Sequence, residues 1–170
     1  ALVLLVGASS ALPNQVTQTI VATATGGDVD QGAENYVYEA GGEGTIVTQT
    51  IDMTADATGY VYQDAYNEAY DVSGDGAVVT QSLSMDASGE DVFQNWYWGY
   101  GNYADLYGVG TTATQNIWQV ADAENYAGQY AWNGAYQDSG MITQGIGQAA
   151  VAGGDIDQYA YNDVGSYGDN

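Results

Sequence analysis

The fold is decided by residues 47–76, which read VTQTIDMTADATGYVYQDAYNEAYDVSGDG. Apolar and polar side chains alternate with a period of two in both halves of this stretch, and Thr58 and Gly59 separate the halves. This period predicts β-strands with two different faces, because successive side chains point to opposite sides of a strand. In a helix the same spacing would spread the apolar residues around the circumference. The stretch therefore predicts two strands joined by a turn.

The same two-strand pattern occurs five times along the chain. The first strand of each copy contains a phrase similar to V-T-Q-T-I, and its glutamine recurs at spacings of 31, 32, 34 and 29 residues. The second strand contains another glutamine, 13 or 14 residues after the first. Glycine-rich turns separate these units. We assign one domain over 16–170, with repeats at 16–44, 45–76, 77–110, 111–140 and 141–170.

Equivalent positions that recur at this period predict an all-β fold. We expect a β-solenoid or β-arcade of five two-strand repeats of about 31 residues, stacked in cross-β fashion. An antiparallel meander is the alternative. Inward-facing amides at fixed positions favour the parallel stack, because each amide can then hydrogen-bond to its copy in the next rung. The predicted ladder residues are Gln18, Gln49, Gln81, Gln115, Gln144, Gln31, Gln63, Gln94, Gln129, Gln158, Asn35, Asn67, Asn133 and Asn162.

The composition excludes several classes of function. The 170 residues include 22 Asp and Glu but no Lys, Arg or His, so the net charge is −22. Such a chain repels phosphate backbones and anionic lipids, which argues against nucleic-acid and membrane-surface roles. Without His, Cys or Lys, the usual general bases and activated nucleophiles are missing. We therefore expect no enzyme and no required cofactor; a carboxylate-pair hydrolase is the remaining catalytic alternative.

The first fifteen residues, ALVLLVGASSALPNQ, differ in composition from the repeats. An apolar run followed by small residues is typical of a signal-peptide remnant, and it is equally typical of an apolar strand. The run is too short to span a bilayer, so no membrane span is expected. Under either interpretation we expect the protein to be exported, and therefore to lie outside the cell or at the cell surface.

Acidic residues in or near glycine-rich turns suggest a calcium-binding hypothesis. Carboxylate oxygens are suitable ligands for calcium, although no EF-hand spacing is present. Ordinary solvated turns are the alternative interpretation. The candidate ligands are Asp28, Asp30, Asp75, Asp155 and Asp157. Because like charges stacked in register repel each other, we also expect cations or low pH to favour assembly.

An aromatic segment interrupts the third repeat. It contains Trp96, Tyr97, Trp98 and Tyr100, and it breaks the period-two alternation. We expect a bulge or a looped-out insertion at this point. Trp and Tyr are common anchors of interfaces, so these four residues are candidates for a contact between subunits, with carbohydrate stacking as the alternative.

The second-strand phrase also resembles a known group of proteins. The Q-x-A-x-N-x-A/V pattern that begins at Gln63, Gln129 and Gln158 resembles the repeats of curlins, the subunits of bacterial curli fibres. The acidic, Tyr- and Gly-rich composition is similar to that of amyloid-like sheath proteins of methanogenic archaea. The chain departs from curlins in its longer repeat, its lack of basic residues and its additional VTQTI strand.

This resemblance implies a secreted cross-β polymer. We therefore expect a structural subunit of an extracellular fibre, sheath or surface layer, which assembles with copies of itself by edge-to-edge β stacking. The alternative is a soluble β-solenoid adhesin or carbohydrate-binding module, with calcium dependence as a further possibility.

Overall fold

The computed structural model describes residues 2–10, 15–96 and 101–167, with the backbone alone described for 2–10. Strands make up 83% of the structure and the fold is all-β. The strands are β1 (Leu2–Ser10), β2 (Gln15–Gly26), β3 (Val29–Tyr38), β4 (Ile46–Ala57), β5 (Tyr60–Ser73), β6 (Val78–Gln94), β7 (Gly101–Tyr107), β8 (Thr111–Gln137), β9 (Gly140–Ala152) and β10 (Ile156–Ser166).

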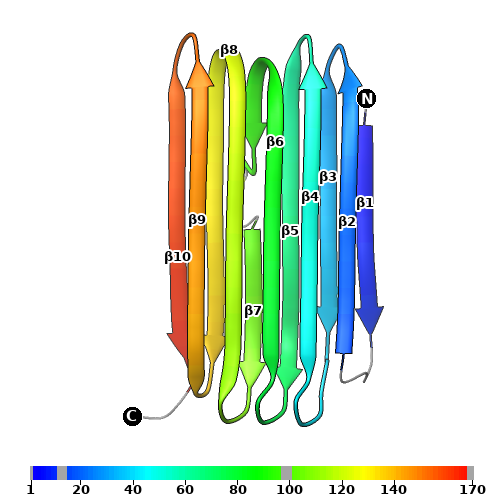
Figure 1. Cartoon of the computed structure of the whole chain (residues 1–170), viewed down its shortest axis with the longest axis vertical. Helices are drawn as coiled ribbons and strands as arrows, with labels where there is room; N and C mark the ends of the chain where they lie inside the picture. The colour runs from blue at the N-terminus through cyan, green and yellow to red at the C-terminus, as the bar shows by residue number, and fades with distance from the viewer. Residues whose placement is uncertain (1, 11–14, 97–100, 168–170) are drawn as a thin grey trace.

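Each strand pairs with the equivalent strand of the neighbouring repeat. Gln49 of β4, for example, lies opposite Gln18 of β2 on one side and Gln81 of β6 on the other. Every pairing between the described strands is parallel. The predicted β-solenoid is confirmed, with about five turns of about 31 residues, and the antiparallel meander is wrong. Figure 1 shows the strands side by side, with the turns at the two ends of the strands.

The strands form two walls that face each other. The first wall contains β2, β4, the first part of β6, the first part of β8 and β9, and the second wall contains β1, β3, β5, the last part of β6, β7, the last part of β8 and β10. In the fourth repeat, β8 continues through the corner between the walls: residues 111–123 pair with β9 and residues 127–137 pair with β10. In the fourth repeat the two walls are therefore connected by a bend within one long strand.

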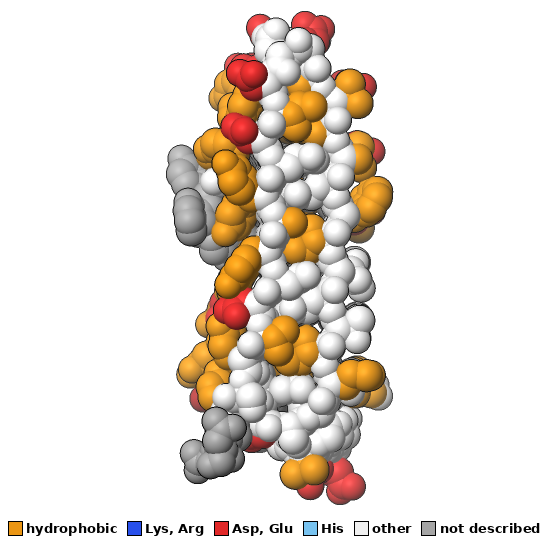
Figure 2. Space-filling view, turned by 90° about the vertical axis from the view of Figure 1, so that its left-hand side faces the viewer, with side chains coloured by type: hydrophobic (Ala, Val, Ile, Leu, Met, Phe, Trp, Pro, Cys, Tyr) orange, Lys and Arg blue, Asp and Glu red, His pale blue; other side chains and the backbone are white. Residues whose placement is uncertain are grey.

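The core lies between the two walls and consists of apolar and amide layers in alternation. The buried apolar side chains form three clusters between the walls. In the third repeat these clusters contain Val79, Leu83 and Val92, respectively. Figure 2 looks at the end of the stack formed by β9 and β10, where three hydrophobic groups alternate with uncoloured polar groups between two rails of backbone. The alternation along each strand therefore produces layers that extend through the whole stack.

The corners between repeats depend on glycine. Gly74 adopts a φ of 126°, in the region that L side chains rarely occupy. A Cβ atom at this position would also collide with the carbonyl oxygen of Gly42 in the preceding corner. The corners stack through backbone hydrogen bonds, such as the one from Gly42 N–H to Ser73 O at 3.2 Å. Glycine here permits the close approach of successive turns.

The third repeat has its second strand divided in two. Gln94 ends β6 opposite Gln63, and Asn102 in β7 lies opposite Asn67. Seven residues separate Gln94 from Asn102, whereas three separate Gln63 from Asn67. The predicted insertion therefore interrupts this strand, and its residues 97–100, including the predicted contacts Tyr97, Trp98 and Tyr100, lie outside the described residues.

At the amino-terminal end of the stack, the second wall is one strand longer than the first. Residues Leu2–Ser10, for which the sequence predicts either a signal-peptide remnant or an apolar strand, form β1 and pair with β3. The strand order of the described residues ends at β1 in one wall and at β2 in the other. The amino-terminal end therefore has a step with the height of one strand, whereas β9 and β10 end the two walls together.

Candidate functional site

Amide side chains form continuous ladders through the interior. In the first wall Gln81 donates from Nε2 to Gln49 Oε1 at 2.8 Å, and Gln115 donates to Gln81 at 2.7 Å. The predicted glutamines of the second wall form the same chain, for example from Gln94 to Gln63 at 3.0 Å. All predicted ladder residues are hydrogen-bonded to a copy in a neighbouring rung, at distances of 2.6–3.0 Å.

The asparagine ladder runs in the opposite sense. Asn67 Nδ2 donates to Asn102 Oδ1 of the following rung at 2.9 Å. In the glutamine ladders, by contrast, each residue donates to the rung before it, as Gln63 donates to Gln31 at 2.9 Å. The two ends of the stack therefore present different amide atoms.

The amides also connect the two walls. Gln81 Nε2 donates across the core to the carbonyl oxygen of Tyr103 at 2.7 Å, and Asn67 Nδ2 donates to the carbonyl oxygen of Ser82 at 3.0 Å. Such bonds compensate for the loss of water around each buried amide. A ladder residue therefore stabilises both the stacking of rungs and the pairing of walls.

Three further ladder residues were missed by the sequence analysis. Asn102 completes the asparagine ladder in the third repeat, and the signal for it was the N-x-A phrase that it shares with Asn67. Gln148 donates to Gln119 at 2.7 Å and forms an additional ladder in the last two repeats. These two glutamines occupy positions that hold methionine in the second and third repeats, because Gln119 lies opposite Met85.

The carboxyl-terminal end of the stack exposes its core. Among the described residues, no strand covers the outer edge of β9 or β10. Gln144 and Ile146 of β9 are only half-buried, and Gln158 of β10 is exposed, although their counterparts in inner rungs are fully buried. Figure 2 shows this open surface, where apolar and polar layers reach the solvent between the two backbone rails. The end therefore presents unpaired backbone edges beside an incompletely covered core.

At the amino-terminal end, two buried amide atoms lack partners. Gln31 and Asn35 are fully buried, but Gln31 Nε2 and Asn35 Oδ1 have no hydrogen-bond partner among the described residues. The register of β1 explains this lack, because Val3 lies opposite Gln31 and Gly7 lies opposite Asn35. Neither Val nor Gly has an amide side chain, so both ladders stop at β3.

The predicted calcium ligands lie in corners or near the beginning of a strand, and some of them accept hydrogen bonds from the chain itself. Asp28 Oδ1 accepts the Tyr60 N–H at 3.2 Å, and Asp75 Oδ1 accepts the Val109 N–H at 3.0 Å. Asp30 and Asp157 lie in the first and last rungs, at equivalent register positions, and Asp155 precedes β10. No three acidic side chains within the described part of the chain are grouped closely enough to hold a metal ion.

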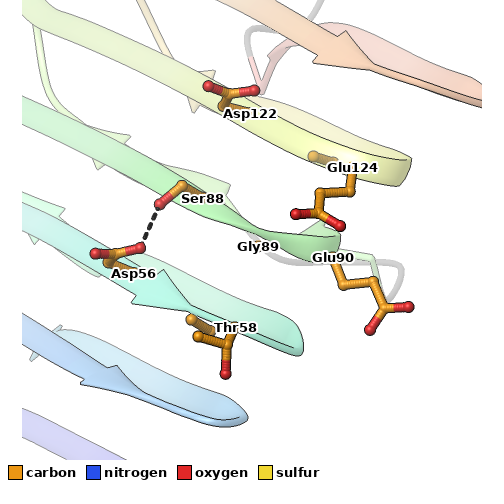
Figure 3. Close-up of a pocket in the computed structure, with 9 residues that line it drawn as sticks. Asp56, Thr58, Ser88, Gly89, Glu90, Asp122 and Glu124 are labelled. Carbon is orange, nitrogen blue, oxygen red and sulfur yellow. Dashed lines mark hydrogen bonds between the residues drawn. The ribbon is translucent and has the colours of Figure 1, made fainter.

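The acidic side chains are separated from one another along the stack. In the residue pairings between described strands, no Asp or Glu lies opposite another Asp or Glu. Figure 3 shows one such column at a hollow of about 410 Å³, where Ser88 lies between Asp56 and Asp122. Ser88 also donates to Asp56 Oδ1 at 2.9 Å. The expected repulsion between stacked acids is therefore reduced within the chain.

One carboxyl group has a strongly altered pKa. Burial, followed by the charge of Asp30, raises the pKa of Asp64 from its usual 3.8 to about 6. Trp96 contacts the ring of Phe93 edge-on, with centroids 5.8 Å apart, and it also contacts Tyr126. Trp96, the one predicted contact residue within the described chain, is therefore partly occupied in packing against its own molecule.

Comparisons with known proteins add no relative: no protein-family model matches the chain, and no curated protein or solved structure matches it. The class is defined by the structure itself, which is a tandem-repeat β-solenoid. The described residues contain no helix with the length and apolar character needed to cross a membrane.

Proposed function

We propose that the protein is a structural subunit of an extracellular polymer, in which copies stack end to end and continue the β-solenoid. The observation that carries the proposal is the open carboxyl-terminal end, where β9 and β10 leave their outer edges unpaired and the core half covered. An uncovered, flat edge of this kind favours pairing with a further strand. Growth by stacking covers both the backbone groups and the apolar layers.

The first and last rungs have compatible residues. In the register of the repeats, Gln144 and Ile146 of the last rung correspond to Gln18 and Ile20 of the first. A second copy placed on the open end therefore continues the glutamine ladder and the aliphatic layer without a change of side-chain type. The export expected from the sequence and the resemblance to curlins and archaeal sheath proteins agree with this function, which requires no catalytic group.

Electron microscopy of the purified chain tests the proposal. We expect ordered filaments or sheets, accompanied by a rise in light scattering. Ile146→Lys should abolish them, because the new ammonium group would be buried without a partner in the junction while remaining partly solvated in the monomer. Val151→Lys is the matched control: it adds the same charge to β9 at a side chain that is 67% exposed, and polymers should still form. Monodisperse wild-type monomers after long incubation at low pH or high calcium would contradict the proposal.

A soluble adhesin or carbohydrate-binding module is the second candidate, because aromatic rings lie stacked on the outside of the second wall. Tyr38 and Tyr70 are parallel, with centroids 5.4 Å apart, and Tyr103 stacks on Trp132 at 6.0 Å. Aromatic faces of this kind can bind sugar rings. Titration with oligosaccharides, followed by tryptophan fluorescence, distinguishes the two functions: saturable binding by a monodisperse monomer favours the module.

A further inference from the structure

We infer that β1 is a displaceable cap on the amino-terminal end, and that the β10 strand of a second copy replaces it during assembly. The inference rests on the proposed function and concerns how the junction forms. Its starting point is the pair of buried, unpartnered amide atoms, Gln31 Nε2 and Asn35 Oδ1, which lie on the β3 edge that β1 covers.

The geometry of β1 is unsuitable for a flush junction. While β1 occupies β3, the second wall projects by one strand beyond β2. Within the described residues the opposite end has no corresponding step, because β9 and β10 end their walls in the same rung. A copy whose β10 pairs with β1 would leave its β9 about one strand spacing, roughly 4.8 Å, away from contact with β2. Removal of β1 makes the two ends complementary.

The replacement strand provides the atoms that β1 lacks. In the register of the repeats, Gln158 of β10 takes the position opposite Gln31, and Asn162 takes the position opposite Asn35. The donor directions also match. Gln31 Nε2 can donate to Gln158 Oε1, as each later glutamine does, and Asn162 Nδ2 can donate to Asn35 Oδ1, as each earlier asparagine does. Both unpartnered atoms are then satisfied.

The exchange also completes the first wall. With β10 on β3, the β9 strand of the same copy lies on β2 and places Gln144 Oε1 within reach of Gln18 Nε2. Within the described part of the monomer, Gln18 Nε2 donates to the carbonyl oxygen of Tyr36, at 3.0 Å. β1 covers one wall and continues no ladder, whereas the end of a second copy covers both walls and continues three. The copy is therefore the better occupant, and β1 delays growth until it is displaced.

A disulfide that fixes β1 tests this mechanism. The chain has no Cys, so the only disulfide in a double variant is the designed one. Ala8→Cys with Tyr36→Cys joins register partners of β1 and β3, at the Cα separation that a disulfide requires. The matched control, Tyr36→Cys with Glu68→Cys, uses the same position to join β3 to β5 and leaves β1 free. Growth is followed by light scattering and electron microscopy, before and after reduction.

We expect the oxidised β1–β3 variant to remain monomeric and to polymerise after reduction, while the oxidised β3–β5 variant grows like the wild type. Growth of the oxidised β1–β3 variant at the control rate would overturn the inference and leave the proposed function intact. Absence of polymers from the wild type itself would overturn the proposed function instead. The two failures are therefore distinguishable.

A second variant tests the role of the amide atoms. Val3→Gln with Gly7→Asn supplies β1 with the two missing ladder side chains, opposite Gln31 and Asn35. We expect a higher melting temperature of the monomer and slower growth, because β1 then completes the ladders that a second copy would otherwise complete. Faster growth, or an unchanged rate together with a higher melting temperature, would contradict a capping role for β1.

Discussion

At the scale of single residues, the ladders show how a repeat makes buried amides tolerable. A lone glutamine inside an apolar core leaves polar atoms without partners, which costs about 1–3 kcal/mol for each unsatisfied group. In this protein Gln81 donates to Gln49 and accepts from Gln115, so its neighbours in both directions satisfy it. The benefit exists only when the same residue recurs in each rung.

The stability of the chain should decrease as the pH rises through about 6. Burial raises the pKa of Asp64 to about 6, so the folded state binds this proton more tightly than the unfolded state. The stabilisation is complete below the usual pKa of 3.8 and is lost as the pH rises through 6. Melting temperatures between pH 4 and pH 8 should therefore fall with pH, and Asp64→Asn should flatten the curve. A melting temperature that rises over this interval would contradict the assignment.

Residue positions were predictable wherever one phrase was repeated without interruption. The alternation around Gln49 and Gln63 indicated which amides face inward, since a period of two leaves little freedom about orientation. Asn102 was missed because the insertion changes its distance from Gln94 and hides the repeat. The partner of Gln31 could not be predicted either, because it depends on which strand covers the first rung.

At the scale of elements, the divided strand of the third repeat depends on one asparagine. Asn95 follows β6 with a φ of 51° and is fully buried. Its Oδ1 accepts the Ala65 N–H at 2.7 Å, and so replaces the backbone carbonyl that the interrupted strand does not supply. The insertion is therefore compatible with continued pairing of β5.

Asn95→Ala should destabilise the protein by about 1–3 kcal/mol, because the buried Ala65 N–H would lose its partner. Chemical denaturation followed by circular dichroism measures the change. Asn125→Ala serves as the control, since Asn125 makes an exposed hydrogen bond to Glu90 and its removal should cost less than about 0.5 kcal/mol. Equal effects of the two substitutions would show that Asn95 does not support the interrupted strand.

The strands themselves followed from the alternation, and their parallel arrangement followed from the amides at fixed positions. The corners were less predictable. Gly-rich turns marked most of them, but the bend of β8 near Glu124 contains no glycine and was not foreseen. A solenoid corner requires only a local change of direction, which residues other than glycine can also adopt.

At the scale of the whole molecule, the distribution of charge allows an acidic chain to stack. A net charge of −22 without any compensating cation should oppose compaction. The pairings avoid direct repulsion, because each acid lies opposite a residue such as Ser, Thr, Tyr or Gly. The proposed junction is different: with β10 on β3, Asp157 of one copy lies opposite Asp30 of the next.

Removal of this repulsive pair should favour polymer growth. Two charges about 4 Å apart in water repel by about 1 kcal/mol, so Asp157→Asn should lower the critical concentration about fivefold at low salt. The difference should shrink as salt is added. Asp163→Asn is the matched control, because both carboxylates accept a hydrogen bond from a tyrosine hydroxyl but Asp163 would lie opposite Tyr36. Sedimentation of polymer from monomer gives the critical concentrations; equal values for the two variants would contradict the proposed register.

The opposite donor directions of the glutamine and asparagine ladders have a consequence for symmetry. One end offers Gln158 Oε1 and Asn162 Nδ2 and the other offers Gln31 Nε2 and Asn35 Oδ1, so each of these atoms meets its complement when the two unlike ends join in parallel register. The proposed junction therefore has no twofold axis, and it does not close into a symmetric dimer. An interface between two unlike surfaces repeats by translation and rotation, which gives open assemblies with a continuous distribution of lengths and a direction from one end to the other.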